Sequence, residues 1–450
     1  MERNMRWIEY LIYFFLFIIP WQTRLILRHG VLNGGNWEYG IVGIHGTEIL
    51  LLVIVLLLGL WNLSSMACPF LFCSRGDESS AKKRNWHASR SIYCLITILF
   101  IILVVSVLSA ANRLIAIQQF IHIIEAIVIF IFLTKLPIDR VKATYAFLLG
   151  LALQAILGIY QFLTQSTFAL QWLGLTLHDS TIGGVSVLEN SVGRWLRAYG
   201  GLPHPNVFGG YMAIGVFLVA VLLTHNLINK KVRIFLLIVN CLFLTGLFFS
   251  FSRSAWLGLI VSLAFFGFFN HRRFISNGSW RLFFLSGVVL LVILSFFYAP
   301  LLKNRISGEG RLETKAVEER VGGYGEARQL FKKYPIRGVG LGNYTLAVRD
   351  DLDSSRPVWV YQPAHNVFLL ISVELGIVGV LMILFCFYFI MRHFSRNLSS
   401  LFALFFILAI FDHYLWSLYS GLMLVGVGVG LLTIMTRDDR VETTMEDKTC

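Results

Sequence analysis

The sequence predicts an all-α polytopic membrane protein with about twelve transmembrane helices. Hydrophobic residues make up 57% of its 450 residues and charged residues only 14%, whereas soluble domains are usually about 25% charged. Runs of roughly 20 apolar residues, long enough to cross a hydrocarbon core about 30 Å thick, recur along the whole chain. The mean hydropathy of +0.72 agrees with this class and argues against a soluble protein.

Length and flanking charge define the predicted spans, because helices buried among other helices are apolar nearly all round and show little periodicity. In chain order, the predicted spans cover residues 7–27, 45–62, 91–110, 115–134, 143–164, 206–224, 234–250, 255–269, 281–299, 365–390, 399–414 and 417–435. Together they predict a single transmembrane domain over residues 1–450.

The basic residues predict that both termini are cytoplasmic. With the N-terminus inside, the cytoplasmic segments hold 21 of the 38 Lys and Arg residues, and the short outer loops hold six. The other eleven lie in one long outer loop, and long loops report topology poorly. The positive-inside rule therefore explains the net charge of +13 without a nucleic-acid partner. Residues 436–450 are predicted to be a cytoplasmic tail.

Two outer loops are long, and we expect function to be assembled there. They cover residues 165–205 and 300–364. In the second loop, an amphipathic helix is predicted over residues 324–334. The stretch "RGVGLGNY" that follows predicts a glycine-rich turn; a phosphate cradle is the alternative, although no strand precedes it. The acidic run at 350–353 is interpreted as a solvated loop, with a sugar or ion contact as the alternative.

The sixth span begins with polar residues at the outer boundary. Pro205 suits a first helical turn, with His204 before it and Asn206 after it. The free N–H groups of this helix end point outward and attract anions. Arg194 and Arg197 lie just ahead of it, which favours an anion site at this position.

A tight external turn, "SFSRSAWLG", joins the seventh and eighth spans and places Arg253 at the membrane boundary. Ser252 or Ser254 can cap the next helix. An arginine at the centre of a transmembrane helix costs about 2.5 to 3.5 kcal/mol, and less near the edge, so it indicates a functional partner. A snorkelling arginine that contacts lipid headgroups is the alternative.

The stretch "YQPAHNVFLLISVELGIVGV" places a histidine at the start of the tenth span. On a continuous helix, Ser372, Gly376 and Gly379 fall within about 40° of His365, and Glu374 falls on the opposite side. We therefore predict that His365 heads a stripe of small residues facing the bundle, with Glu374 outside the site. A helix cap or an interfacial residue is the alternative reading of this histidine.

Arg197, Arg253 and His365 come from separate segments that the topology brings to the same membrane face. Guanidinium groups match pyrophosphate oxygens bidentately, and a neutral imidazole can accept a proton from a sugar hydroxyl. The combination predicts group transfer from a lipid pyrophosphate.

These motifs resemble the O-antigen ligase and polymerase family of bacterial envelope polysaccharide enzymes. The ligase signature, His-[Asn, Ser or Gln]-x9-Gly-x-x-[Gly, Thr or Tyr], is matched by His365, Asn366, Gly376 and Gly379. The segments "RAYGGLPHPNVFGGY", "FSRSAWLG" and "YPIRGVGLGNY" are also similar to family positions. The resemblance covers roughly residues 143–435.

The resemblance implies a GT-C-like helical bundle in the bacterial inner membrane, with a large periplasmic loop carrying short helices. It implies an inverting glycosyltransferase that uses an undecaprenyl-pyrophosphate-linked glycan as donor and lipid A core or a growing glycan as acceptor. The resemblance also implies that the enzyme needs no cofactor, metal ion or nucleotide sugar. Carried over residue by residue, His365 is the acceptor-side base, supported by Asn366, His204 and Asn206, and the pyrophosphate is held by Arg197, Arg253 and Arg194.

Two alternatives stay open at this point. The signature match favours a ligase, but a repeat-unit polymerase of the same family shares the donor and the residues. A twelve-span transporter or flippase is the alternative from another class. Against it, no internal repeat is evident, and few charges lie inside the spans, where Glu125, Glu374 and Asp412 are the candidates.

Overall fold

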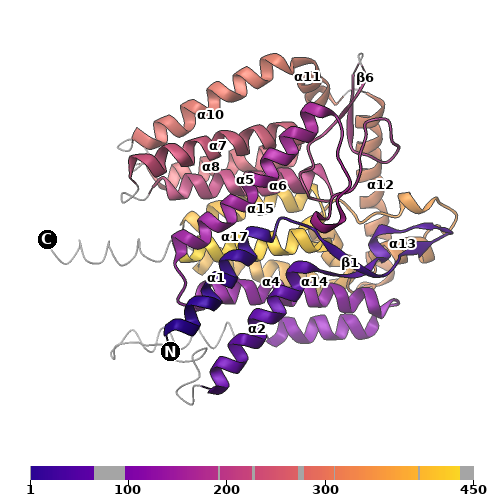
Figure 1. The fold of residues 1–450 in the computed structure, drawn as a ribbon. Coiled ribbons are helices and arrows are strands. Elements are labelled where there is room, and N and C mark those ends of the chain that lie inside the picture. The colour runs from indigo at the N-terminus through magenta and orange to yellow at the C-terminus, as the bar shows by residue number, and fades with distance from the viewer. Residues whose placement is uncertain are drawn as a thin grey trace.

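The computed structural model describes residues 2–64, 97–190, 193–224, 229–271, 278–308, 310–393 and 396–435. Most of them lie in helices (Figure 1). The predicted tail, residues 436–450, lies outside the described residues.

Six helices of the described residues are long and apolar enough to cross a membrane, so the chain is a multi-pass membrane protein. They are α4 (Arg113–Lys135), α5 (Arg140–Thr164), α6 (Pro205–Leu222), α7 (Lys230–Ser250), α10 (Gly278–Phe297) and α14 (Val367–His393).

Six further helices occupy the remaining predicted spans. These are α1 (Glu2–Ile18), α2 (Gly46–Ser64), a helix over Thr97–Ser109, α8 (Arg253–Phe269), α15 (Arg396–Phe411) and α17 (Tyr419–Met435). A helix thus lies at each of the twelve predicted positions, while the number of membrane crossings stays a prediction.

The first predicted span, residues 7–27, is wrong beyond Ile18. Helix α1 ends at Ile18, because Pro20 disfavours helical backbone at the residue before it. The chain then forms β1 (Arg24–Arg28), which pairs antiparallel with β4 (Val42–His45). Between them lies the small hairpin of β2 (Val31–Leu32) and β3 (Gly35–Asn36). The sequence analysis did not predict this sheet.

The tip of that hairpin is fastened to the second outer loop. The side-chain amide of Asn33 donates to the backbone oxygens of Ser354 at 2.9 Å and of Arg356 at 3.0 Å. The beginning of the chain is therefore tied to a segment more than 300 residues later.

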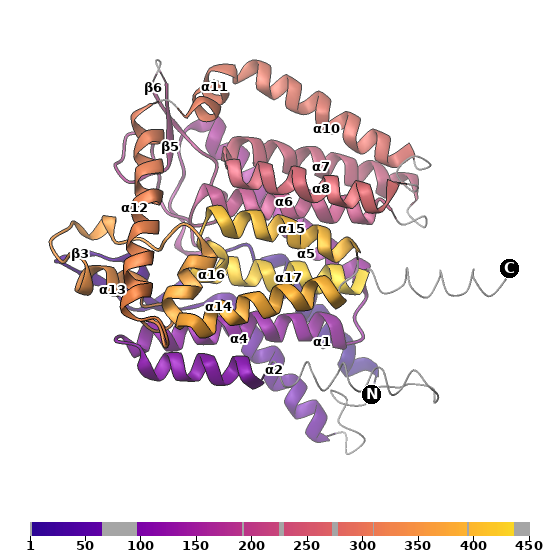
Figure 2. The same ribbon diagram turned by 180° about the vertical axis from the view of Figure 1, so that it is seen from behind.

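Helix α6 is the centre of the bundle, and every one of its residues is buried. It packs against α5, α7, α8, α15 and α17. The beginning of α1 and the end of α17 lie at one end of the bundle (Figures 1 and 2). The strands and helices of the outer loops gather at the opposite end. This arrangement agrees with the predicted topology, while its orientation in the membrane stays a prediction.

The two long loops carry defined elements. The first contains β5 (Val187–Asn190) and β6 (Gly193–Leu196), which form a hairpin. The second contains α11 (Ala299–Ser307), α12 (Arg311–Lys333) and α13 (Tyr344–Asp351). The amphipathic helix predicted over residues 324–334 is the second half of α12, apart from its last residue.

The predicted glycine-rich turn packs against α14. Gly338, Gly340 and Gly342 all have positive φ, and a β-carbon at Gly338 would lie 2.4 Å from the backbone of Glu374. The amide of Gly340 donates to the Glu374 carbonyl oxygen at 3.0 Å. Glycine is therefore required here both by conformation and by close backbone contact.

Helix α14 is broken at Gly376, where φ is 66° and ψ is −154°. The prediction of one continuous helical stripe from His365 to Gly379 is therefore wrong, since α14 starts only at Val367 and its two parts have different phases. The amide of Ile377, next to the break, donates to the Pro335 carbonyl oxygen at 2.7 Å. The segment just ahead of the glycine-rich turn thus satisfies a donor that the break leaves open.

Candidate functional site

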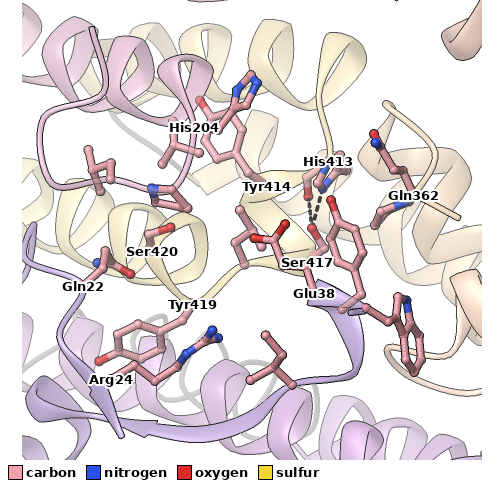
Figure 3. Close-up of a pocket in the computed structure, with 18 of the residues that line it drawn as sticks. Gln22, Arg24, Glu38, His204, Gln362, His413, Tyr414, Ser417, Tyr419 and Ser420 are labelled. Carbon is pink, nitrogen blue, oxygen red and sulfur yellow. Dashed lines mark hydrogen bonds between the residues drawn. The ribbon is translucent and has the colours of Figure 1, made fainter. Parts of the chain in front are cut away.

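A polar cavity of about 690 Å³ is enclosed by segments from distant parts of the chain. Its walls come from the β1–β4 region, α4, the loop before α6, the end of the second outer loop and the segment between α15 and α17. Figure 3 shows side chains from several of these walls facing one another. Polar residues on the walls include Arg24, His45, His122, His204, His365 and Asp412.

His365 lies on this wall, directly before α14. Its neighbour Asn366 caps the helix, since its side-chain oxygen accepts from the Leu369 amide at 3.0 Å. The same side chain donates to the Ile410 carbonyl oxygen at 3.1 Å, which ties the start of α14 to the end of α15. Tyr324 of α12 donates to the His365 carbonyl oxygen at 3.3 Å. The backbone of His365 is therefore fixed on both sides.

Asp412 faces the imidazole of His365. Its carboxylate is 4% exposed, and Oδ1 lies 3.5 Å from His365 Nδ1. Both of its oxygens accept hydrogen bonds, from the Asn206 side chain at 2.7 Å and from the His413 amide at 2.9 Å, which favours the charged form. The carboxylate is therefore ionised beside the ring. With Nδ1 directed at Asp412, the other ring nitrogen, Nε2, is left for a molecule in the cavity.

A chain of hydrogen bonds extends from Asp412 to Arg197. Asn206 donates from its side chain to Asp412 Oδ2 at 2.7 Å and accepts from Arg197 Nη2 at 2.7 Å. Arg197 also donates to the Ser250 carbonyl oxygen at 2.7 Å and to Ser186 Oγ at 2.8 Å. Because Arg197 is 5% exposed and does not line the cavity, its position argues against the predicted direct contact with pyrophosphate.

His204 is the N-cap of α6, as its place before Pro205 suggested. Its Nδ1 accepts from the Asn206 amide at 3.1 Å, which requires a neutral ring. Burial lowers the pKa of His204 to about 3. The ring lines the same cavity as His365, and its supporting role stays a prediction.

Arg253 follows the tight turn that the sequence predicted, and begins α8. Ser252 occupies the N-cap position, but its side chain makes no capping hydrogen bond. Arg253 Nη2 lies 3.0 Å from Glu313 Oε2, and Arg305 of α11 donates to the other oxygen of the same carboxylate. Two guanidinium groups therefore share one carboxylate, which leaves a net charge of about +1 on this group.

A second group has the same composition. Arg194 Nε lies 3.8 Å from Glu189 Oε1, and Arg311 Nη2 lies 2.8 Å from the same oxygen. Asn304 of α11 donates to the Glu189 carbonyl oxygen at 3.0 Å, which links this group to the helix that carries Arg305. Arg194 and Arg253 therefore belong to neighbouring cationic groups, although neither lines the cavity.

Glu374 was predicted to lie outside the site, but it also lines the cavity. The carboxylate is 3% exposed and accepts from Trp416 Nε1 at 2.7 Å. The prediction failed because it assumed a straight helix and could not place the segment between α15 and α17.

The sequence analysis missed a further group of cavity residues. His45, at the end of β4, and His122, in α4, flank Glu48 of α2. The signal that could have revealed them is a repeated His-x-x-Glu pattern, at 45–48 and at 122–125.

The fold and the cavity define a helical multi-pass membrane protein with a polar, histidine-bearing site at the end of the bundle that carries the large loops. Residues 236–384 match the family model described as O-Antigen ligase. This match confirms the resemblance to the O-antigen ligase and polymerase family and supports a membrane glycan-transfer role. No curated protein and no solved structure matches the chain.

The matched segment contains His365 and Arg253 but ends before Asp412. It begins after Arg197 and Asn206. The family match therefore supports part of the candidate site, and the remaining part rests on the geometry described above.

Proposed function

We propose that the protein transfers a glycan from undecaprenyl pyrophosphate to a sugar hydroxyl of an acceptor, at the periplasmic face of the inner membrane. The observation that carries this proposal is the placement of His365 on the cavity wall with its Nδ1 facing the buried carboxylate of Asp412. That arrangement orients the ring and leaves Nε2 for the substrate, as in other His–Asp pairs that act as general bases.

In the proposed reaction, the acceptor hydroxyl oxygen attacks the anomeric carbon of the donor sugar. A bond forms between these two atoms while the bond from the anomeric carbon to the pyrophosphate oxygen breaks, with inversion at carbon. The hydroxyl proton passes to His365 Nε2, and Asp412 stabilises the resulting imidazolium. The bond electrons leave with the lipid pyrophosphate, whose growing charge the protein has to stabilise.

The two cationic groups of the outer loops suit that leaving group. Arg253 and Arg305 share the carboxylate of Glu313, and the other group pairs Arg194 with Arg311 on one carboxylate. Each group has an excess positive charge, and guanidinium binds phosphate oxygens bidentately. We assign Arg253 and Arg194 to the donor, and Arg197 to positioning Asn206 and, through it, Asp412. No step of this reaction requires a metal.

The experiment uses purified protein, a lipid-pyrophosphate glycan and two acceptors offered separately, a lipid A core oligosaccharide and a second lipid-linked repeat unit. We expect His365→Ala to reduce transfer by about 10² to 10⁴-fold, and Arg253→Gln to raise the donor KM. The exposed His29 and Arg328 supply the matched controls His29→Ala and Arg328→Gln, which should behave as wild type.

Product formed only with the core oligosaccharide would identify a ligase, and product formed only with the second repeat unit would identify a polymerase. Unchanged transfer by His365→Ala would refute the site. If wild type forms no product with either acceptor but moves the lipid-linked glycan across a vesicle membrane, the transporter alternative is favoured instead.

A further inference from the structure

His45, Glu48 and His122 form a compact group of three ligand-type side chains on a part of the cavity wall that the transfer reaction does not use. The donor atoms of the three residues all lie within 4.8 Å of one another. Their exposed fractions are 6%, 9% and 3%. They come from β4, α2 and α4, so the fold brings His122 to two residues that lie more than 70 positions earlier in the sequence.

We propose that this group binds one divalent transition-metal ion of the zinc class. Two imidazoles and one carboxylate are the ligand set of many zinc sites that keep one position open. His45 Nδ1 lies 2.9 Å from Glu48 Oε2, and His122 Nε2 lies 3.3 Å from Glu48 Oε1. Ligand bonds of about 2.0 to 2.1 Å in a tetrahedron give edges of roughly 3.3 Å, and both histidine–carboxylate distances lie near this value.

An independent observation supports a ligand in this group. His122 is almost completely buried, yet its Nε2 has no hydrogen-bond partner within the described residues, although this nitrogen faces the Glu48 carboxylate. Unpaired polar atoms in such an environment are costly. Glu125, one helical turn after His122, also has a buried oxygen without a partner. A divalent cation would satisfy His122 Nε2 and balance the charge of the Glu48 carboxylate.

The surroundings fix the histidine rings in place. The ring of Tyr419 stacks on His45 with centroids 4.1 Å apart, and His122 meets the same tyrosine edge-on at 5.0 Å. Tyr419 itself is hydrogen-bonded to Thr47 at 2.7 Å. Such support holds ligands in one orientation. Because His45 and His122 both line the cavity, the open position of the ion faces it and is accessible to water or to a substrate oxygen.

A second group, formed by His365, Asp412 and His413, also brings three potential ligands together. Both oxygens of Asp412 accept from groups that are not metal ligands, the Asn206 side chain and the His413 amide. In the group around Glu48, within the described residues, only Oε2 accepts such a bond, from the His45 amide, and Oε1 faces His122. His413 Nδ1 lies 2.6 Å from Ser417 Oγ. We therefore assign the ion to the group around Glu48. The group around Asp412 serves as the control in the metal-binding test.

The test measures metal content in purified full-length protein that has been stripped with a chelator, reloaded with Zn²⁺ or Co²⁺ and freed of excess ion by gel filtration. We expect about one ion per chain in wild type, with the visible absorption of tetrahedral Co²⁺. His122→Gln and Glu48→Gln should bind at least about tenfold more weakly, whereas His413→Gln should retain the ion. Gel-filtration profiles of the metal-free variants check that each one is folded.

Wild-type protein that holds less than about a tenth of an ion per chain would overturn the proposal, and this result does not depend on any variant. Retention of the ion by folded His122→Gln would also overturn it, as would loss in His413→Gln alone. Because the readout is metal content, these outcomes are independent of whether the protein transfers glycans.

Discussion

Replacing Asp412 by asparagine tests the proposed base most directly. A charge pair at 3.5 Å, the distance from Asp412 Oδ1 to His365 Nδ1, is worth about 5 kcal/mol at an effective dielectric constant of 20. Water in the cavity reduces this value. We therefore expect Asp412→Asn to lower kcat by roughly 10² to 10³-fold, because the imidazolium formed in the transition state loses its partner.

The substitution also affects stability. Asp412 accepts hydrogen bonds from the Asn206 side chain and from the His413 amide. An asparagine offers only one oxygen, so its amide group faces one of these donors, at a cost of about 1 to 3 kcal/mol. Thermal unfolding therefore has to be measured beside transfer. Asp350, which is exposed and forms a surface ion pair with Arg349, supplies the control Asp350→Asn, expected to match wild type.

The decisive comparison is a double-mutant cycle measured in the transfer assay. If Asp412 acts through His365, the double variant His365→Ala with Asp412→Asn should transfer within about threefold of His365→Ala alone, because the two residues function as one unit. Losses that multiply in the double variant would refute the reasoning. So would a folded Asp412→Asn protein with wild-type kcat.

Two further predictions concern Gly376 and His204. Gly376→Ala should unfold at a markedly lower temperature, since φ at this residue is 66° and a β-carbon would lie 2.2 Å from the Ile336 carbonyl oxygen. Gly267→Ala, with open space around it, is the control. Equal melting temperatures of the two variants would contradict the argument. Because burial lowers the pKa of His204 to about 3, the unfolded chain binds a proton below pH about 6.5 that the folded chain does not bind. Stability is therefore lost as the pH falls. His204→Asn keeps a good N-cap, and its melting temperature should decrease less between pH 7 and 5 than that of wild type. Parallel decreases of the two melting temperatures would exclude the assigned role of His204.

The positions of the helices could be predicted from sequence because a bilayer demands long apolar runs wherever the chain crosses it. The β1–β4 sheet could not, since Leu25, Ile26 and Leu27 continue the apolar character of α1 and hide the point where the helix ends. Hydropathy measures transfer into lipid and says little about whether an apolar segment is helical.

The histidine of the site was predictable because it belongs to a motif with defined spacing, and its aspartate was not. Asp412 was noted only as an intramembrane charge, because nothing in the sequence shows that the end of α15 lies beside the start of α14 in space. Arg197 was predicted to contact a ligand on the basis of its charge, but charge alone does not reveal burial. The break at Gly376 likewise depends on a backbone conformation that glycine permits and no periodicity reports.

The bond from Asn33 to the second outer loop has a consequence for the biosynthesis of the protein. Asn33 and Ser354 are 321 residues apart, so the wall formed by the β1–β4 region cannot be fastened until most of the chain has left the ribosome. The segment that supplies Asp412 emerges later still. A nascent or truncated chain can therefore insert its apolar helices while it has no closed cavity, and the cavity is completed only by the last part of the chain to be made.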